Sequence, residues 1–150
     1  MANIHEYQVT VNWKGSYEGS GSVSTKLGGT FPLSVPPEYK GKGEGTNPEE
    51  LLTSAVCACY SITYGIIAAN RKLEYTDLKV EAVGEVEQNG SMLKFLAITI
   101  KPTITLAAGA DDAAAALAED IAHKADAYCV ITNAVKGNVA IKVEPTVNRG

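Results

Sequence analysis

The stretch NPEELLTSAVCACYSITYGIIAAN, residues 47–70, decides the fold because it contains the clearest helix start in the chain. Asn47 is a favoured N-cap residue, and Pro48 occupies the first helical position, where its missing N–H costs nothing. Glu49 and Glu50 follow at the positive end of the helix dipole, and Glu50 stands three residues after Asn47, as in a capping box. We therefore expect one helix over the whole stretch.

Residues 51–70 carry no charge, and this run is long enough to span a bilayer. Hydroxyl-bearing side chains and Gly65 interrupt the run, and the rest of the chain has the pattern of amphipathic β-sheet. We interpret the segment as a helix buried on most faces of a soluble fold. Because the N-terminus has no secretory pattern, we expect a cytoplasmic protein without a membrane partner.

The segment before the helix alternates apolar and polar residues, which is typical of half-buried strands. Glycines and prolines separate the alternating runs and mark turns. We expect strands at residues 4–13, 22–25 and 30–35, followed by a loop at 36–46.

The segment after the helix begins with a hairpin, in which Asn89-Gly90 supplies a two-residue turn between long strands at 78–87 and 93–106. Asp111 or Asp112 then caps a second helix, which is expected to reach Tyr128-Cys129. A closing strand follows at residues 138–147. This order predicts a single α+β domain spanning residues 1–150, with an antiparallel sheet against two helices.

The charge balance excludes several classes of partner. The chain has 150 residues with 17 acidic and 13 basic side chains, and its net charge is −4. Nucleic acids and anionic membranes bind basic faces, so neither is expected as a partner. The three cysteines are an odd number in a chain without a secretion signal, which argues against a disulfide framework.

Most familiar catalytic and metal-binding motifs are absent from the sequence. Gly41-Lys42 is followed by Gly43, so the loop lacks the Ser or Thr of a phosphate-binding loop. Cys57 and Cys59 stand two apart, and in a helix their side chains point about 200° from each other, so they cannot share one metal. We expect no metal and no cofactor.

The cysteines are the remaining candidates for chemistry. Cys57 lies between Val56 and Ala58 and is interpreted as a small core residue. Cys59 and Cys129 belong to the two helices expected to pack together. If their Cα atoms lie within about 7 Å, they can form a reversible disulfide. Such a pair reduces an oxidant through a sulfenic acid on one sulfur.

The pattern Asn47-Pro48-Glu49-Glu50-Leu51-Leu52, followed by Cys59-Tyr60 and a later Cys129, resembles the OsmC/Ohr family. The resemblance covers nearly the whole chain in the same order of elements. It also includes Trp13-x-Gly15, the glycine-rich loop at residues 41–46 and the segment TNAVKGN at residues 132–138.

This resemblance implies a small, intertwined homodimer that reduces organic hydroperoxides with thiols in defence against oxidative stress. Cys59 matches the peroxidatic cysteine of the family, Cys129 the resolving cysteine, and Glu49 a carboxylate beside the reactive thiol. The family further implies an external dithiol reductant, such as a lipoyl protein. The apolar residues Tyr60, Ile62, Tyr64 and Tyr128 are either the lining of a hydroperoxide pocket or plain core.

Glu49 has two interpretations. It stands ten residues before Cys59, which on one straight helix is about 15 Å of rise, so a site containing both residues has to join two chains. Alternatively, Glu49 only stabilises the positive end of the helix.

The sequence departs from the family at one functional position. The family places an arginine in the glycine-rich segment after the first strand, where Glu18 stands here; Lys14, Lys40 or Lys42 would have to replace it. Two alternatives to a peroxidase therefore remain. One is an OsmC-like binding or redox-sensing protein that holds a small apolar ligand at the dimer cleft, and the other is a structural dimer with inert cysteines.

Overall fold

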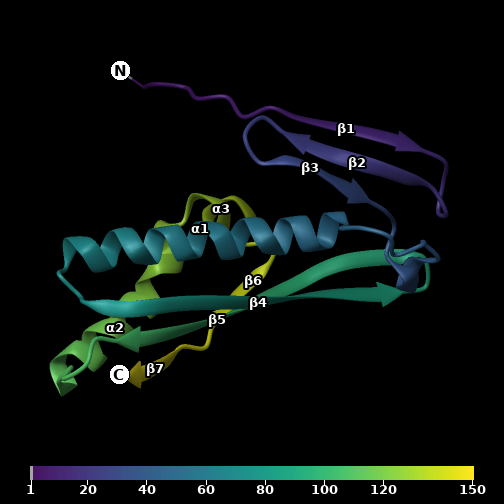
Figure 1. Ribbon diagram of the computed structural model, residues 1–150. Coiled ribbons are helices and arrows are strands. Elements are labelled where there is room, and N and C mark those ends of the chain that lie inside the picture. The colour runs from purple at the N-terminus through teal and green to yellow at the C-terminus, as the bar shows by residue number, and fades with distance from the viewer. Residues whose placement is uncertain (1) are drawn as a thin grey trace. The chain divides into compact units, whose positions relative to one another are not determined.

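The computed structural model describes residues 2–150 (Figure 1). The chain divides into two compact units, the residues up to Leu51 and the segment Leu52–Gly150. Helices and strands both occur, so the chain has the expected α+β class. The expectation that residues 1–150 form a single domain stays a prediction, and the two units are described separately.

The N-terminal unit contains a three-stranded antiparallel sheet in the order β1-β2-β3, with β1 Val9–Lys14, β2 Ser20–Thr25 and β3 Gly29–Leu33. The first strand was expected from residue 4 but begins at Val9. The partner of Val9 is Thr25, the last residue of β2, so the residues before Val9 have no opposing strand in this sheet.

The glycine-rich loop after β3 contains the short 3-10 helix η1, Pro37–Tyr39. Gly41 N–H donates to Pro36 O at 3.0 Å. A Cβ atom at Gly41 would lie 1.8 Å from Val35 O, so this fold of the loop requires glycine there.

Helix α1 spans Pro48–Asn70, which confirms the expected helix. Asn47 caps it, because Asn47 Oδ1 accepts the Glu50 N–H at 2.8 Å. The Glu50 carboxylate accepts the Thr46 hydroxyl at 2.9 Å.

The sheet of the C-terminal unit is built on a long hairpin. Strands β4 Tyr75–Asn89 and β5 Met92–Leu106 pair antiparallel, as expected. The turn residues are Gly90 and Ser91, one position later than predicted, and Gly90 has the positive φ of 62° that favours glycine.

The chain's last strands correct the prediction of an antiparallel sheet. Strands β6 Ala140–Val143 and β7 Thr146–Arg149 both pair parallel to β5. The helices between β5 and β6 return the chain to the start of β5, as a crossover connection does. The expected single strand is interrupted between β6 and β7, at Glu144 and Pro145, because proline has no N–H for the ladder.

The second helical segment is broken where one helix was expected. Helix α2 spans Asp112–Lys124, and Asp111 caps it by accepting the Ala114 N–H at 2.9 Å. The 3-10 helix η2, Ala125–Tyr128, follows, and α3 spans Val130–Val135. Cys129 lies between them with extended backbone, φ −81° and ψ 117°. It is therefore the N-cap of α3 and not the end of a long helix.

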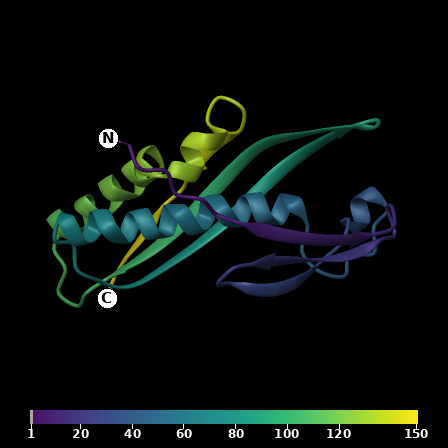
Figure 2. The ribbon, with the colours of Figure 1, turned by 90° about the horizontal axis from the view of Figure 1, so that it is seen from above.

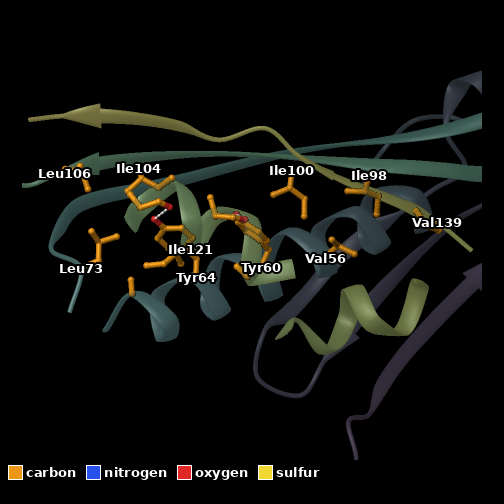
Figure 3. Packing of buried hydrophobic residues seen from close by; sticks show 14 residues of the cluster. Val56, Tyr60, Tyr64, Leu73, Ile98, Ile100, Ile104, Leu106, Ile121 and Val139 are labelled. Atoms are coloured by element: carbon orange, nitrogen blue, oxygen red, sulfur yellow. Dashed lines mark hydrogen bonds between the residues drawn. The ribbon is translucent and has the colours of Figure 1, made fainter. Parts of the chain in front are cut away.

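The core of the C-terminal unit lies between β5 and the helices α1 and α2 (Figure 3). Seen from above, α2 runs beside α1 (Figure 2). Alternate residues of β5, including Ile98, Ile100 and Ile104, face the helices and are fully buried. From α1, residues four apart form the buried stripe Val56, Tyr60, Tyr64 and Ala68.

Two tyrosines of this stripe attach α1 to α2. Tyr60 Oη donates to Ala122 O at 2.6 Å, and Tyr64 Oη donates to Ala118 O at 3.0 Å. By length and composition α1 could cross a membrane. Its tyrosine-bonded stripe identifies it instead as a core helix of this unit, since a lone anchor would have no such partner.

The expectation that α1 is buried on most faces is wrong for the single chain. Only 22% of the most apolar stretch of α1 is buried. Ile62 is 65% exposed and Ile66 57% exposed. The chain covers one side of α1 with β5 and α2, and the other side keeps exposed apolar side chains.

Candidate active site

Cys59 and Cys129, 70 residues apart in sequence, lie within hydrogen-bonding distance of each other through their thiols. Cys59 lies near the middle of α1 and is half-buried, and Cys129 is fully buried. Both thiols are free. The sulfur of Cys129 accepts the Thr132 N–H at 3.3 Å, which holds it at the start of α3.

The environment of Cys59 favours its thiolate. Burial alone raises the pKa of a thiol, but hydrogen bonds outweigh burial here and lower the pKa of Cys59 below the ordinary value of 9.0. The donors are the Cys129 thiol, the Thr63 hydroxyl, and the backbone N–H groups of Ile131 and Val130. Cys59 is therefore the more acidic sulfur of the pair.

The environment of Cys129 has the opposite effect. Burial, together with its hydrogen bond to Cys59, raises the pKa of Cys129, although Thr132 and the Ile131 backbone act against the rise. Cys59 therefore gives up its proton at a lower pH than Cys129. A thiolate beside a protonated thiol is the arrangement that a two-cysteine redox reaction uses.

Cys57 is separate from this pair. It is half-buried, and its thiol donates to Val80 O of β4 at 3.4 Å. Burial raises the pKa of Cys57, so it is the thiol of a packing residue and a poor nucleophile.

Glu49 is half-buried in the first turn of α1. It belongs to the N-terminal unit, and ten residues of helix separate it from Cys59, about 15 Å along the axis. Its expected position beside the reactive thiol stays a prediction.

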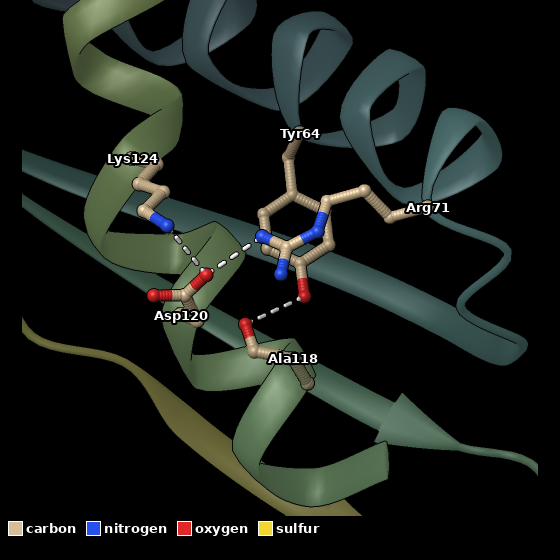
Figure 4. A network of polar contacts seen from close by, with 5 residues as sticks. All are labelled: Tyr64, Arg71, Ala118, Asp120 and Lys124. Atoms are coloured by element: carbon tan, nitrogen blue, oxygen red, sulfur yellow. Dashed lines mark hydrogen bonds and ion pairs between the residues drawn. The ribbon is translucent and has the colours of Figure 1, made fainter. Parts of the chain in front are cut away.

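Both arginines of the chain pair with aspartates of α2. Arg71 Nη1 lies 2.6 Å from Asp120 Oδ2, which also accepts Lys124 Nζ at 2.9 Å (Figure 4). These bonds, the one from Arg71 first, lower the pKa of Asp120. Arg149 Nη2 lies 2.6 Å from Asp112 Oδ1. The donors that lower the pKa of Cys59 are neutral groups of the C-terminal unit.

The apolar residues named as either lining or core divide into two groups. Tyr60 and Tyr64 are core residues. Tyr128 and Val130, which flank Cys129, are 72% and 71% exposed. Ile62, three residues after Cys59, is also exposed, so exposed apolar side chains occur near both cysteines in sequence.

Two threonines beside the sulfurs were missed at the level of sequence. Thr63 stands four residues after Cys59 in α1, and Thr132 three residues after Cys129. Helical spacing could have indicated Thr63. Thr132 required knowledge that Cys129 begins a helix. Within residues 2–150, no group of three or more His, Cys, Asp or Glu side chains is arranged to hold a metal.

Comparisons with known sequences agree on one family. A family model described as OsmC-like protein matches residues 41–144. The chain is 33% identical over 146 residues to the uncharacterized protein YmaD of Bacillus subtilis, covering 97% of each chain. It is 26% identical to the peroxiredoxin OsmC of Escherichia coli, covering 87% of this chain and 90% of that protein.

Solved structures show the same fold. An OsmC-like protein of unknown function from Vibrio cholerae matches with a TM-score of 0.76 at 19% identity, covering 94% of this chain and 100% of that one. A putative organic hydroperoxide resistance protein from Vibrio cholerae, with captopril bound in one of its active sites, matches with a TM-score of 0.67 at 28% identity. That match covers 99% of this chain and 94% of the other.

Proposed function

Since the chain belongs to the OsmC-like family, we propose that it is a thiol-dependent peroxidase that reduces organic hydroperoxides with Cys59 and Cys129. The observation that supports this most is the hydrogen bond between two free thiols of unequal acidity. The relatives named as a peroxiredoxin and as organic hydroperoxide resistance proteins support the same chemistry.

The proposed reaction starts at the more acidic sulfur. The Cys59 thiolate attacks the terminal oxygen of the hydroperoxide, the O–O bond breaks, and the alkoxide takes a proton and leaves as an alcohol. Cys59 is then a sulfenic acid. Cys129 attacks its sulfur, the S–O bond breaks, and one water leaves as the Cys59–Cys129 disulfide forms.

The catalytic cycle closes with an external dithiol, by family resemblance a lipoyl protein. The dithiol reduces the Cys59–Cys129 bond by thiol–disulfide exchange and is itself oxidised to a disulfide. The exposed apolar side chains of Ile62, Tyr128 and Val130 favour a hydroperoxide with an apolar alkyl or aryl group. Free thiols suit the reducing cytoplasm, where we place the reaction.

The proposed active form is a homodimer. The exposed side of α1, with Ile62 and Ile66, is an apolar surface that a second copy of the chain would cover. The carboxylate of Glu49 would then approach the Cys59 thiol of the second copy. Residues 1–150 of each chain would form one domain, and the two chains would form an intertwined homodimer.

The test is a peroxidase assay with cumene hydroperoxide as oxidant and dithiothreitol as reductant. We expect Cys59→Ser to abolish turnover. Cys129→Ser, treated with the hydroperoxide in the absence of dithiothreitol, is expected to stop at the Cys59 sulfenic acid without forming an intramolecular disulfide. Cys57→Ser is the matched control and is expected to keep activity. If the native protein consumes the hydroperoxide no faster than Cys59→Ser, the peroxidase proposal is wrong.

A second candidate function is a redox-sensing or ligand-binding protein on the same fold. The observation that favours it is the pairing of both arginines with aspartates of α2, which leaves the candidate site without a guanidinium from its own unit. Such a protein would form the Cys59–Cys129 disulfide with one equivalent of oxidant but show no sustained turnover. Mass spectrometry of the oxidised protein, beside the assay above, distinguishes the two functions.

A further inference from the structure

Thr132 is buried next to Cys129 with nothing else to bond. Its side chain is 4% exposed, and its N–H donates to Cys129 Sγ at 3.3 Å. Its hydroxyl oxygen is buried and has no hydrogen-bond partner within residues 2–150. A buried hydroxyl without an acceptor is unfavourable. If Cys129 becomes a thiolate, its sulfur would be a strong acceptor for this hydroxyl.

Thr63 is in the equivalent position for the other sulfur. It stands one turn after Cys59 on α1, and residues four apart lie on the same side of a helix. Its hydroxyl is one of the groups whose hydrogen bonding lowers the pKa of Cys59. Each of the two sulfurs therefore has one threonine hydroxyl of its own, from two different helices.

We propose that Thr63 and Thr132 are the paired hydrogen-bond donors that stabilise the two sulfurs as thiolates in turn, Thr63 on Cys59 for the attack and Thr132 on Cys129 for disulfide formation. The inference rests on the proposed two-cysteine reaction and assigns each threonine to one of its steps. Thr132 acts when Cys129 gives up its proton, because the thiolate is the acceptor that its hydroxyl lacks.

The charges around the site make these neutral donors important. Both arginines are held in ion pairs on α2. A hydrogen bond to a charged group contributes more than one between neutral groups, and replaces part of what a cation would supply. Each threonine acts to lower the pKa of its own cysteine, although burial and the bond to Cys59 raise the pKa of Cys129 on balance.

The Thr63 half is tested by the pH dependence of Cys59 alkylation, with iodoacetamide and no hydroperoxide present. We expect Thr63→Val to raise the pKa of Cys59 by about one unit, a tenfold loss of thiolate near neutral pH. Thr63→Ser, which keeps the hydroxyl, is expected to restore the native profile. Ser61→Ala is the control, since its hydroxyl donates to Cys57 O. An unchanged profile in Thr63→Val overturns this half.

The Thr132 half is tested by following the oxidation of Cys59 with hydrogen peroxide by mass spectrometry. We expect Thr132→Val to form the disulfide about tenfold more slowly and to accumulate Cys59 sulfinic acid as excess peroxide reacts again. Thr132→Ser is expected to restore disulfide formation. Native disulfide rates in Thr132→Val overturn this half.

The two variants also separate a chemical role from a structural one. Thr132→Val removes a hydroxyl with no strong acceptor, so we expect its thermal unfolding midpoint to equal or exceed that of the native protein. A lower midpoint with a parallel loss in Thr132→Ser would assign the threonine to folding and overturn the proposal. Because neither readout needs turnover, an inactive protein with the expected pKa and disulfide results would contradict the peroxidase proposal alone.

Discussion

The Cys129 thiol donates a hydrogen bond to the sulfur of Cys59, although the two residues are 70 positions apart. The bond lowers the pKa of the acceptor and raises that of the donor. One contact thus makes one of two chemically identical groups more acidic than the other. Cys129 can make this contact because the helix is broken there: its backbone is extended, and the residue is the N-cap of α3.

Cys59 is expected to react with alkylating reagents at a lower pH than the other two cysteines. The lowered pKa of Cys59 means that its thiolate forms at lower pH, whereas Cys57 and Cys129 have raised pKa values and form thiolates only at higher pH. Alkylation with iodoacetamide, followed by peptide mass spectrometry, should modify Cys59 first. In urea the three cysteines should react alike. Faster modification of Cys57 than of Cys59 in the folded protein would contradict the assignment.

The exposed side of α1 is expected to hold two chains together. Ile66→Glu places a charge on this side, where the native side chain is 57% exposed in the single chain. Burying an unpaired carboxylate at an interface is unfavourable by several kcal/mol, so we expect the variant to sediment as a monomer at micromolar concentration.

Leu27→Glu is the matched control for this experiment. Leu27 is 95% exposed, and we expect the variant to sediment like the native protein. A dimer in Ile66→Glu as tight as in the control would place the interface elsewhere.

Tyr60 is expected to contribute to stability through its hydroxyl. Tyr60→Phe removes the bond to Ala122 O and should lower the free energy of unfolding by about 1 kcal/mol at neutral pH. Urea unfolding measures this difference. Tyr7→Phe, at a side chain 90% exposed, should leave the free energy unchanged.

Alkaline pH is expected to weaken the fold through the same residue. Burial, followed by the charges of Tyr64 and Asp126, raises the pKa of Tyr60 above the ordinary value of 10.0. Because the pKa of Tyr60 is higher in the folded than in the unfolded protein, the protonated Tyr60 hydroxyl contributes fully to stability below pH 10. This contribution is lost as the pH rises above 10. Tyr60→Phe should therefore lose less stability than the native protein between pH 9 and pH 11. Equal losses would show that Tyr60 does not titrate with unfolding.

Gly84 is expected to tolerate no side chain. A Cβ atom there would lie 2.4 Å from Thr53 Oγ1 of α1 and 2.8 Å from the Phe95 ring of β5. Gly84→Ala should cost about 1–3 kcal/mol of unfolding free energy through overpacking.

Gly65→Ala makes the complementary change, because its nearest neighbour would be Tyr75 Oη at an ordinary 3.5 Å. It should stabilise α1 by about 0.5–1 kcal/mol. Thermal unfolding of both variants measures the contrast. A stabilised Gly84→Ala would mean that α1 and β4 separate more easily than their packing indicates.

Local signals in the sequence were sufficient for much of the framework. The Asn47 cap, the bounds of α1, the Asp111 cap and the β4–β5 hairpin follow from interactions that span only a few residues. The choice of Cys59 over Cys57 as the reactive cysteine came from the family resemblance and stays a prediction. Such features are readable in sequence because a cap or a turn forms its hydrogen bonds with its immediate neighbours.

Only the tertiary structure decided how these pieces act on one another. The parallel pairing of β6 and β7 with β5, the unpaired side of α1, and the approach of Cys129 to Cys59 all depend on which distant segments pack together. The acidity of Cys59 is the clearest case. The sequence supplies a thiol in a helix with Thr63 one turn away, but the other donors that lower its pKa are Cys129 and the first residues of α3. No short-range pattern predicts which distant elements folding brings together, and these donors therefore could not be read from the sequence.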